Sequence, residues 1–145
     1  GREIDVPRSR IACVFYNRLR AKPAWKLQTD PTVIYAATLA DPGFNGNITR
    51  AHLRELDNPY NTYLNEGLPP GPSGNPGRAA LQAVAQPLTC ADFFFVSKND
   101  GTHVFCPTLD CHNKQVQACP SVGMSTGRIC TWRPLARNAG PKAGF

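Results

Sequence analysis

The most unusual part of the sequence is residues 57–76, which read Asp-Asn-Pro-Tyr-Asn-Thr-Tyr-Leu-Asn-Glu-Gly-Leu-Pro-Pro-Gly-Pro-Ser-Gly-Asn-Pro. It contains five prolines and three glycines, a composition found both in linkers and in tightly turned loops. Linkers rarely carry large side chains that need burial or a ligand, whereas this stretch contains Tyr60, Tyr63 and Leu68. We therefore interpret it as a rigid, ordered loop with a functional role inside one domain.

Short elements are predicted on both sides of this loop. Hydrophobic residues spaced three and four apart, together with turn residues, predict helices and one hairpin. The predicted helices cover residues 8–21, 31–39, 50–56, 77–86 and 109–118, and the predicted strands cover residues 93–97 and 102–106. Asp30, Thr49 and Thr108 are expected to cap the second, third and last helices. The predicted fold class is therefore α+β, with short helices, a β-hairpin and long ordered loops rich in Pro and Gly.

The length of 145 residues suits a single domain, which we place at residues 1–118. Residues 119–145 contain three prolines, four glycines and no acid, and are predicted to be a basic, mostly disordered extension. Much of the net charge of +6 falls there, because residues 1–117 hold 12 basic and 10 acidic residues. This nearly neutral body argues against nucleic-acid binding. Purely apolar runs such as residues 93–96 are too short to cross a bilayer.

The cysteine spacing does not indicate a metal site. The chain has six cysteines, at positions 13, 90, 106, 111, 119 and 130. No pair has the two-residue spacing of a zinc knuckle, so no metal is expected. We interpret the cysteines as small buried hydrophobic residues, with incidental ones in the extension. A single disulfide is the alternative, since an even count permits pairing in an oxidising compartment.

Six motifs follow one another along the chain. They are Val14-Phe-Tyr-Asn-Arg-Leu19, Leu27-Gln-Thr-Asp-Pro-Thr-Val-Ile-Tyr35, Tyr60-Asn-Thr-Tyr63, Gly67-Leu-Pro-Pro-Gly-Pro72 with Asn75-Pro-Gly77, Phe93-Phe-Phe-Val96 and His112-Asn-Lys114. In this order they resemble the catalytic domain of the YceG-like family, the MltG-type endolytic murein transglycosylases, over about residues 8–117. An older family label, aminodeoxychorismate lyase, would require a Schiff-base lysine in a pyridoxal phosphate cradle, which none of the five lysines offers.

The resemblance implies cleavage of peptidoglycan between N-acetylmuramic acid and N-acetylglucosamine, leaving a 1,6-anhydro end. One neutral carboxylic acid protonates the glycosidic oxygen, and the substrate's own 6-hydroxyl attacks C1 while the carboxylate takes its proton. The resemblance therefore requires neither a second carboxylate nor a metal nor a cofactor, unlike the common two-carboxylate glycosidases. An apolar setting must raise the pKa of the acid.

The resemblance places the catalytic glutamate in a Val-Glu-Lys/Arg-Glu segment ahead of the Val14 motif. That glutamate falls at or before Gly1, so this chain is expected to lack it. Glu3 matches the second acid of the segment and is the acid here with a potential catalytic part. The alternative for Glu3 is an exposed surface acid.

Six residues are implied to bind substrate, namely Asn17, Arg18, Gln28, Tyr60, Asn61 and Tyr63. Gln28 is expected to line the cleft, where it binds an N-acetyl group or orients the acid, with loop structure as the alternative. Tyr60 and Tyr63 stack on sugar faces, donate to the glycosidic region or anchor the loop. Arg18 either meets a carboxylate of the substrate or forms a surface ion pair. Asn61 is expected to tie the loop backbone together.

The implied partner is the glycan strand of peptidoglycan, with the cell wall synthesis machinery as a further candidate. In the family the protein lies at the periplasmic face of the inner membrane, held by an N-terminal anchor that these residues do not include. A different function class stays open beside the enzyme: a glycan-binding module without chemistry. Detection of anhydro products separates the two.

Overall fold

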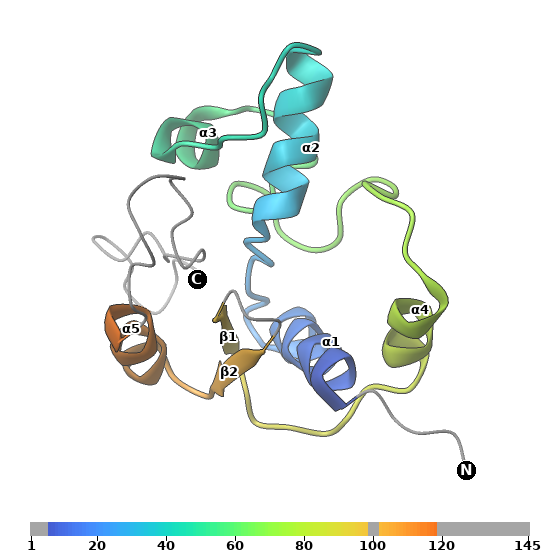
Figure 1. The fold of residues 1–145 in the computed structure, drawn as a ribbon, viewed down its shortest axis with the longest axis vertical. Helices are drawn as coiled ribbons and strands as arrows, with labels where there is room; N and C mark the ends of the chain where they lie inside the picture. Colours follow the sequence, from blue (N-terminus) through green and yellow to red (C-terminus); the bar gives the residue numbers. More distant parts are fainter. Residues whose placement is uncertain (1–5, 99–101, 119–145) are drawn as a thin grey trace. The chain divides into compact units, whose positions relative to one another are not determined.

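The computed structural model describes residues 6–98 and 102–118 (Figure 1). The elements are α1 (Val6–Arg20), α2 (Asp30–Ala40), α3 (Arg50–Glu55), α4 (Arg78–Ala85), β1 (Phe94–Ser97), β2 (His103–Cys106) and α5 (Leu109–Ala118). The α+β class is confirmed, and every predicted element is present with ends within two residues of the prediction. The predicted extension over residues 119–145 and the centre of the predicted hairpin turn lie outside the described residues.

The chain divides into two compact units. The described part of the first unit consists of residues 6–17, 76–98 and 102–118, and the described part of the second unit consists of residues 18–75. In sequence the second unit is therefore an insertion between the two parts of the first. No helix within the described ranges combines the length and hydropathy needed to cross a bilayer.

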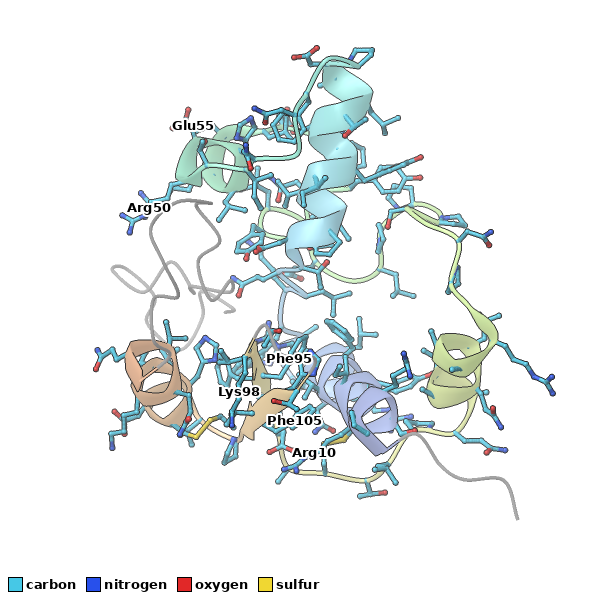
Figure 2. All side chains as sticks on the ribbon, viewed as in Figure 1. Arg10, Arg50, Glu55, Phe95, Lys98 and Phe105 are labelled. Carbon is cyan, nitrogen blue, oxygen red and sulfur yellow. A yellow bond between two sulfur atoms is a disulfide. The ribbon has the colours of Figure 1, made fainter. Side chains whose placement is uncertain are left out.

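The first unit is built around the hairpin. Its strands are antiparallel, with Phe95 opposite Phe105. Side chains alternate between the two faces of a strand, so these two rings share a face, and they lie near Arg10 of α1, whose guanidinium is 4.6 Å from the centre of the Phe105 ring (Figure 2). On the other face, Phe94 is buried and stacks on the fully buried ring of His112 in α5. The two helices thus cover opposite faces of the hairpin.

The second unit begins with the end of α1 and contains α2 and α3. Val33, Ala36 and Ala37 form the buried side of α2. Thr49 caps α3 as predicted, because its hydroxyl accepts a hydrogen bond from the backbone N–H of His52. The imidazole of His52 accepts in return from the backbone N–H of Thr49, which completes a capping box.

The interpretation of the cysteines as unpaired hydrophobic residues is wrong for the four described ones. Cys13 of α1 is bonded to Cys90, and Cys106 of β2 is bonded to Cys111 of α5. The alternative of a single disulfide is also wrong, because the described residues form two. Cys119 and Cys130 lie outside the described residues. The physical reason for the error is that disulfide partners are set by the folded backbone, here across a separation of 77 residues, and cannot be deduced from spacing.

The long-range disulfide is expected to contribute more to stability than the short one. A disulfide lowers the entropy of the unfolded chain by an amount that grows with the logarithm of the length of the loop it closes, and the separations are 77 and 5 residues. We expect Cys13→Ala with Cys90→Ala to lower the free energy of unfolding by about 4 kcal/mol, and Cys106→Ala with Cys111→Ala by about 2 kcal/mol. Denaturant unfolding without reductant measures both. Equal losses in the two variants would contradict the loop-length account.

Candidate functional site

Two of the sequence motifs lie against each other in the second unit. We call residues 27–30 and 60–63 the paired loops. The backbone N–H of Gln28 donates to the carbonyl of Thr62 at 3.1 Å, and the N–H of Thr29 donates to the Thr62 hydroxyl at 2.9 Å. The Tyr63 hydroxyl donates to a carboxylate oxygen of Asp30 at 2.6 Å. The paired loops are therefore joined by backbone and side-chain hydrogen bonds although neither is a strand.

Asp30 does not cap α2, contrary to the prediction, and its carboxylate binds Tyr63 instead. Thr29 occupies the cap position, and Asp30 is the first residue of the helix. A buried tyrosine hydroxyl needs an acceptor, and the Asp30 carboxylate supplies one to Tyr63. Burial raises the pKa of Asp30 above its usual value, and the hydrogen bond from Tyr63 partly opposes that rise. Burial and the Asp30 charge raise the pKa of Tyr63, so its hydroxyl remains a donor at neutral pH.

Arg18 is buried rather than on the surface, so the surface ion pair considered for it is wrong. Only 1% of the residue is exposed. Its guanidinium donates to the carbonyls of Lys26 and Leu27 at 3.1 and 3.2 Å and lies 5.7 Å from the centre of the Trp25 ring. Burial lowers the pKa of Arg18 to about 9, which still leaves it protonated at neutral pH. Arg18 therefore fixes the backbone that leads directly into Gln28.

Gln28 has an uncommon backbone conformation. Its φ of 52° lies in the left-handed region, and among the described residues other than glycine it alone does so. For a residue with a side chain this conformation costs about 1–3 kcal/mol and needs support from its surroundings. Gln28 is 6% exposed, so its side chain is largely enclosed by the unit. Gln28 thus lies in the paired loops in a left-handed backbone conformation, and the hydrogen bond from its N–H to the Thr62 carbonyl supports that conformation.

Asn61 ties the loop backbone together, as predicted. It is fully buried, and its amide nitrogen lies within 3.0–3.3 Å of the carbonyls of His52, Leu53 and Leu56 at the end of α3. Its side-chain oxygen accepts from the N–H of Tyr63 at 3.0 Å. The last carbonyls of a helix lack partners within the helix, so one amide here both terminates α3 and shapes the loop.

Tyr60 is half-buried, as are Thr29 and Asp30 among the paired loops. Its ring meets that of Tyr35 in α2 edge to face, with centres 4.8 Å apart. A Cβ at Gly71 would lie 3.1 Å from the Tyr60 hydroxyl, so the Pro-rich segment approaches this side chain closely. Leu68, on the same segment, is 73% exposed. The loop therefore encloses Tyr63 and leaves Tyr60 and Leu68 accessible to solvent.

Among the remaining predicted site residues, the structure describes Asn17. Asn17 belongs to the first unit, where its amide donates to the carbonyls of Cys90 and Asp92, both at 2.9 Å. Glu3 and Gly1 lie outside the described residues. Sequence reasoning missed Thr62, which is 1% exposed and central to the paired loops. The available signal was its position inside the Tyr60–Tyr63 motif between residues that were singled out.

No cluster of three or more His, Cys, Asp or Glu side chains suited to a metal ion occurs in residues 6–98 and 102–118. The site is instead built from amide, hydroxyl and one carboxylate group. Such groups can hold backbone in place and bind hydroxyl or acetamido groups of a sugar.

Comparisons with known proteins agree on one family. Residues 2–118 match the YceG-like family. The chain is 45% identical over 107 residues to the endolytic murein transglycosylase of Bacillus subtilis (strain 168), covering 74% of this chain and 28% of that protein. It is 31% identical over 111 residues to the endolytic murein transglycosylase of Streptococcus pneumoniae serotype 2 (strain D39 / NCTC 7466), covering 75% and 20%.

A solved structure is similar as well. The crystal structure of a yceG-like protein from Listeria monocytogenes matches with a TM-score of 0.63 and 43% identity, covering 79% of this chain and 34% of that one. The chain thus spans between 20% and 34% of the length of these three proteins.

The hydrogen bond between Tyr63 and Asp30 is expected to stabilise the second unit. Tyr63→Phe removes the hydroxyl and keeps the ring. A hydrogen bond to an ionised group is worth about 1.5–3 kcal/mol, so we expect the free energy of unfolding at neutral pH to fall by about that amount. Denaturant unfolding measures it, and Tyr60→Phe, which removes a hydroxyl outside this pair, is the matched control.

The same pair is expected to control how stability depends on pH. Because the folded-state pKa of Asp30 is raised, the folded protein binds this proton more tightly than the unfolded chain, and stability declines as pH rises through that pKa. The Tyr63 hydroxyl lowers the pKa, so in Tyr63→Phe the decline moves to higher pH. Unfolding at a series of pH values tests this, with Asp30→Asn expected to lack the decline. Superimposable pH profiles for wild type and Tyr63→Phe would argue against it.

Proposed function

Because the chain belongs to the YceG-like family, we propose that it forms part of an endolytic murein transglycosylase. The observation that carries this proposal is the sequence identity to the Bacillus subtilis protein of that name. The proposed substrate is the glycan strand of peptidoglycan, and the proposed location is the cell envelope. Two disulfides among the described residues are in keeping with an oxidising compartment.

The proposed reaction breaks the bond between N-acetylmuramic acid and N-acetylglucosamine. A neutral carboxylic acid gives its proton to the glycosidic oxygen, which leaves as the hydroxyl of N-acetylglucosamine. The 6-hydroxyl of the muramic acid attacks C1, and its proton passes to the carboxylate, which restores the acid. The nucleophile is already tethered to the reacting centre, so no water is consumed and the product carries a 1,6-anhydro ring.

In this proposal the paired loops form a fixed wall of the substrate site. Arg18, Asn61 and Tyr63 hold backbone or side-chain groups of the same unit, so their contribution is to keep the wall in place. Gln28 is the proposed ligand of an N-acetyl group. Tyr60 is half-exposed and has a ring face of the kind that stacks on sugars.

Digestion of purified, uncrosslinked glycan strands tests the proposal. We expect 1,6-anhydro ends, detected by mass spectrometry, when the chain is preceded by a Val-Glu segment at the position that the family resemblance gives to the general acid. The matched control carries Val-Gln at that position and is expected to be inactive, because an amide cannot donate the proton. Cleavage that yields ordinary reducing ends would refute the transglycosylase reaction. Binding to the strands without cleavage in either preparation would favour the glycan-binding module.

A further inference from the structure

Thr62 joins the paired loops through both its backbone and its side chain. It is 1% exposed. Its carbonyl accepts from the N–H of Gln28 at 3.1 Å, and its hydroxyl lies 2.9 Å from the N–H of Thr29 and 2.8 Å from the hydroxyl of Thr32. One residue therefore contacts both Gln28 and the residue that follows it.

The hydroxyl protons of this cluster can be assigned. The Thr32 hydroxyl donates to the Thr29 carbonyl at 2.7 Å, so it has only lone pairs to offer the other hydroxyls. The Thr29 hydroxyl donates to it at 3.1 Å. Thr62 must then donate its own proton to Thr32, because the single proton of the Thr32 hydroxyl is already donated to the Thr29 carbonyl. Each hydroxyl has a defined role, which makes the arrangement stiff.

The backbone of Gln28 is held on both sides in its left-handed conformation. Arg18 binds the carbonyls of the two residues before it, and Thr62 binds the N–H of Gln28 and of Thr29 after it. A residue with a side chain leaves this conformation when the support is removed, and the direction of its side chain changes with φ.

We propose that Thr62 is the positioning residue for Gln28, setting the direction in which the Gln28 amide meets the N-acetyl group of the glycan strand. The ligand in this inference, the N-acetyl group, rests on the proposed function. The coupling between Thr62 and Gln28 does not depend on it. The hydroxyl of Thr62 acts through Gln28 and does not touch the substrate.

The first experiment measures steady-state kinetics on glycan strands in the Val-Glu preparation described above. Thr62→Val keeps the shape of the side chain but leaves the Thr29 N–H without its acceptor. We expect KM to rise about five- to tenfold, the loss of about one hydrogen bond, with kcat little changed. Thr62→Ser keeps the hydroxyl and is expected to stay within about twofold of wild type. Thr38→Val, on the exposed face of α2, is the matched threonine control.

A double-mutant cycle separates positioning from general destabilisation. If Thr62 acts through Gln28, Thr62→Val has no further effect on KM in a Gln28→Ala background. Additive effects of the two substitutions would overturn the proposal, because a merely structural role of Thr62 would persist without the Gln28 amide.

The second experiment does not depend on activity. In NMR spectra, the backbone and side-chain amide resonances of Gln28 are expected to shift in Thr62→Val. They are expected to keep their wild-type positions in Thr62→Ser and in Thr38→Val. Unchanged Gln28 resonances in Thr62→Val would overturn the proposal. Absence of anhydro ends in the Val-Glu preparation with Thr62 and Gln28 intact would overturn only the proposed function. Should Thr62→Val fail to fold, Thr32→Val removes the acceptor of the Thr62 proton and is expected to shift the same resonances.

Discussion

The buried hydrogen bonds of the paired loops are the constraint on which the second unit depends. Neither residues 27–30 nor residues 60–63 belong to a strand, and residue 30 alone begins a helix. Buried N–H and carbonyl groups without regular partners would each cost stability, so side chains have to supply the partners. Thr62, Asn61 and Arg18 do so here.

The end of α1 contributes to each unit through adjacent residues. Asn17 binds two carbonyls of the first unit, and Arg18 binds two carbonyls of the second. Adjacent residues on a helix point in different directions, so one short stretch can serve two separate sets of contacts. This explains why an amide and a guanidinium follow each other in an otherwise amphipathic helix.

Sequence reasoning succeeded where the cause is local. Hydrophobic spacing, caps such as Thr49, and the amide of Asn61 act within a few residues, so the elements and this loop contact could be predicted. It failed where the partner is distant in sequence. The acceptor of the Tyr63 hydroxyl is 33 residues away and Cys90 is 77 residues from Cys13, and neither separation carries a periodic signal. Threonine hydroxyls such as that of Thr62 are equally uninformative until the backbone brings them together.

The electrostatics of the second unit follow from the same burial. Burial lowers the pKa of Arg18 and raises that of Asp30, so both charges are disfavoured by their surroundings. Tyr63 experiences both, since the Asp30 charge raises its pKa and the Arg18 charge lowers it. A single buried charge without a partner would lower the stability of the fold. Here the Arg18 cation and the Asp30 anion have opposite effects on the pKa of Tyr63, and these effects partly offset each other. The neutral phenol donates to the anion, and this hydrogen bond stabilises the Asp30 carboxylate against its partial burial.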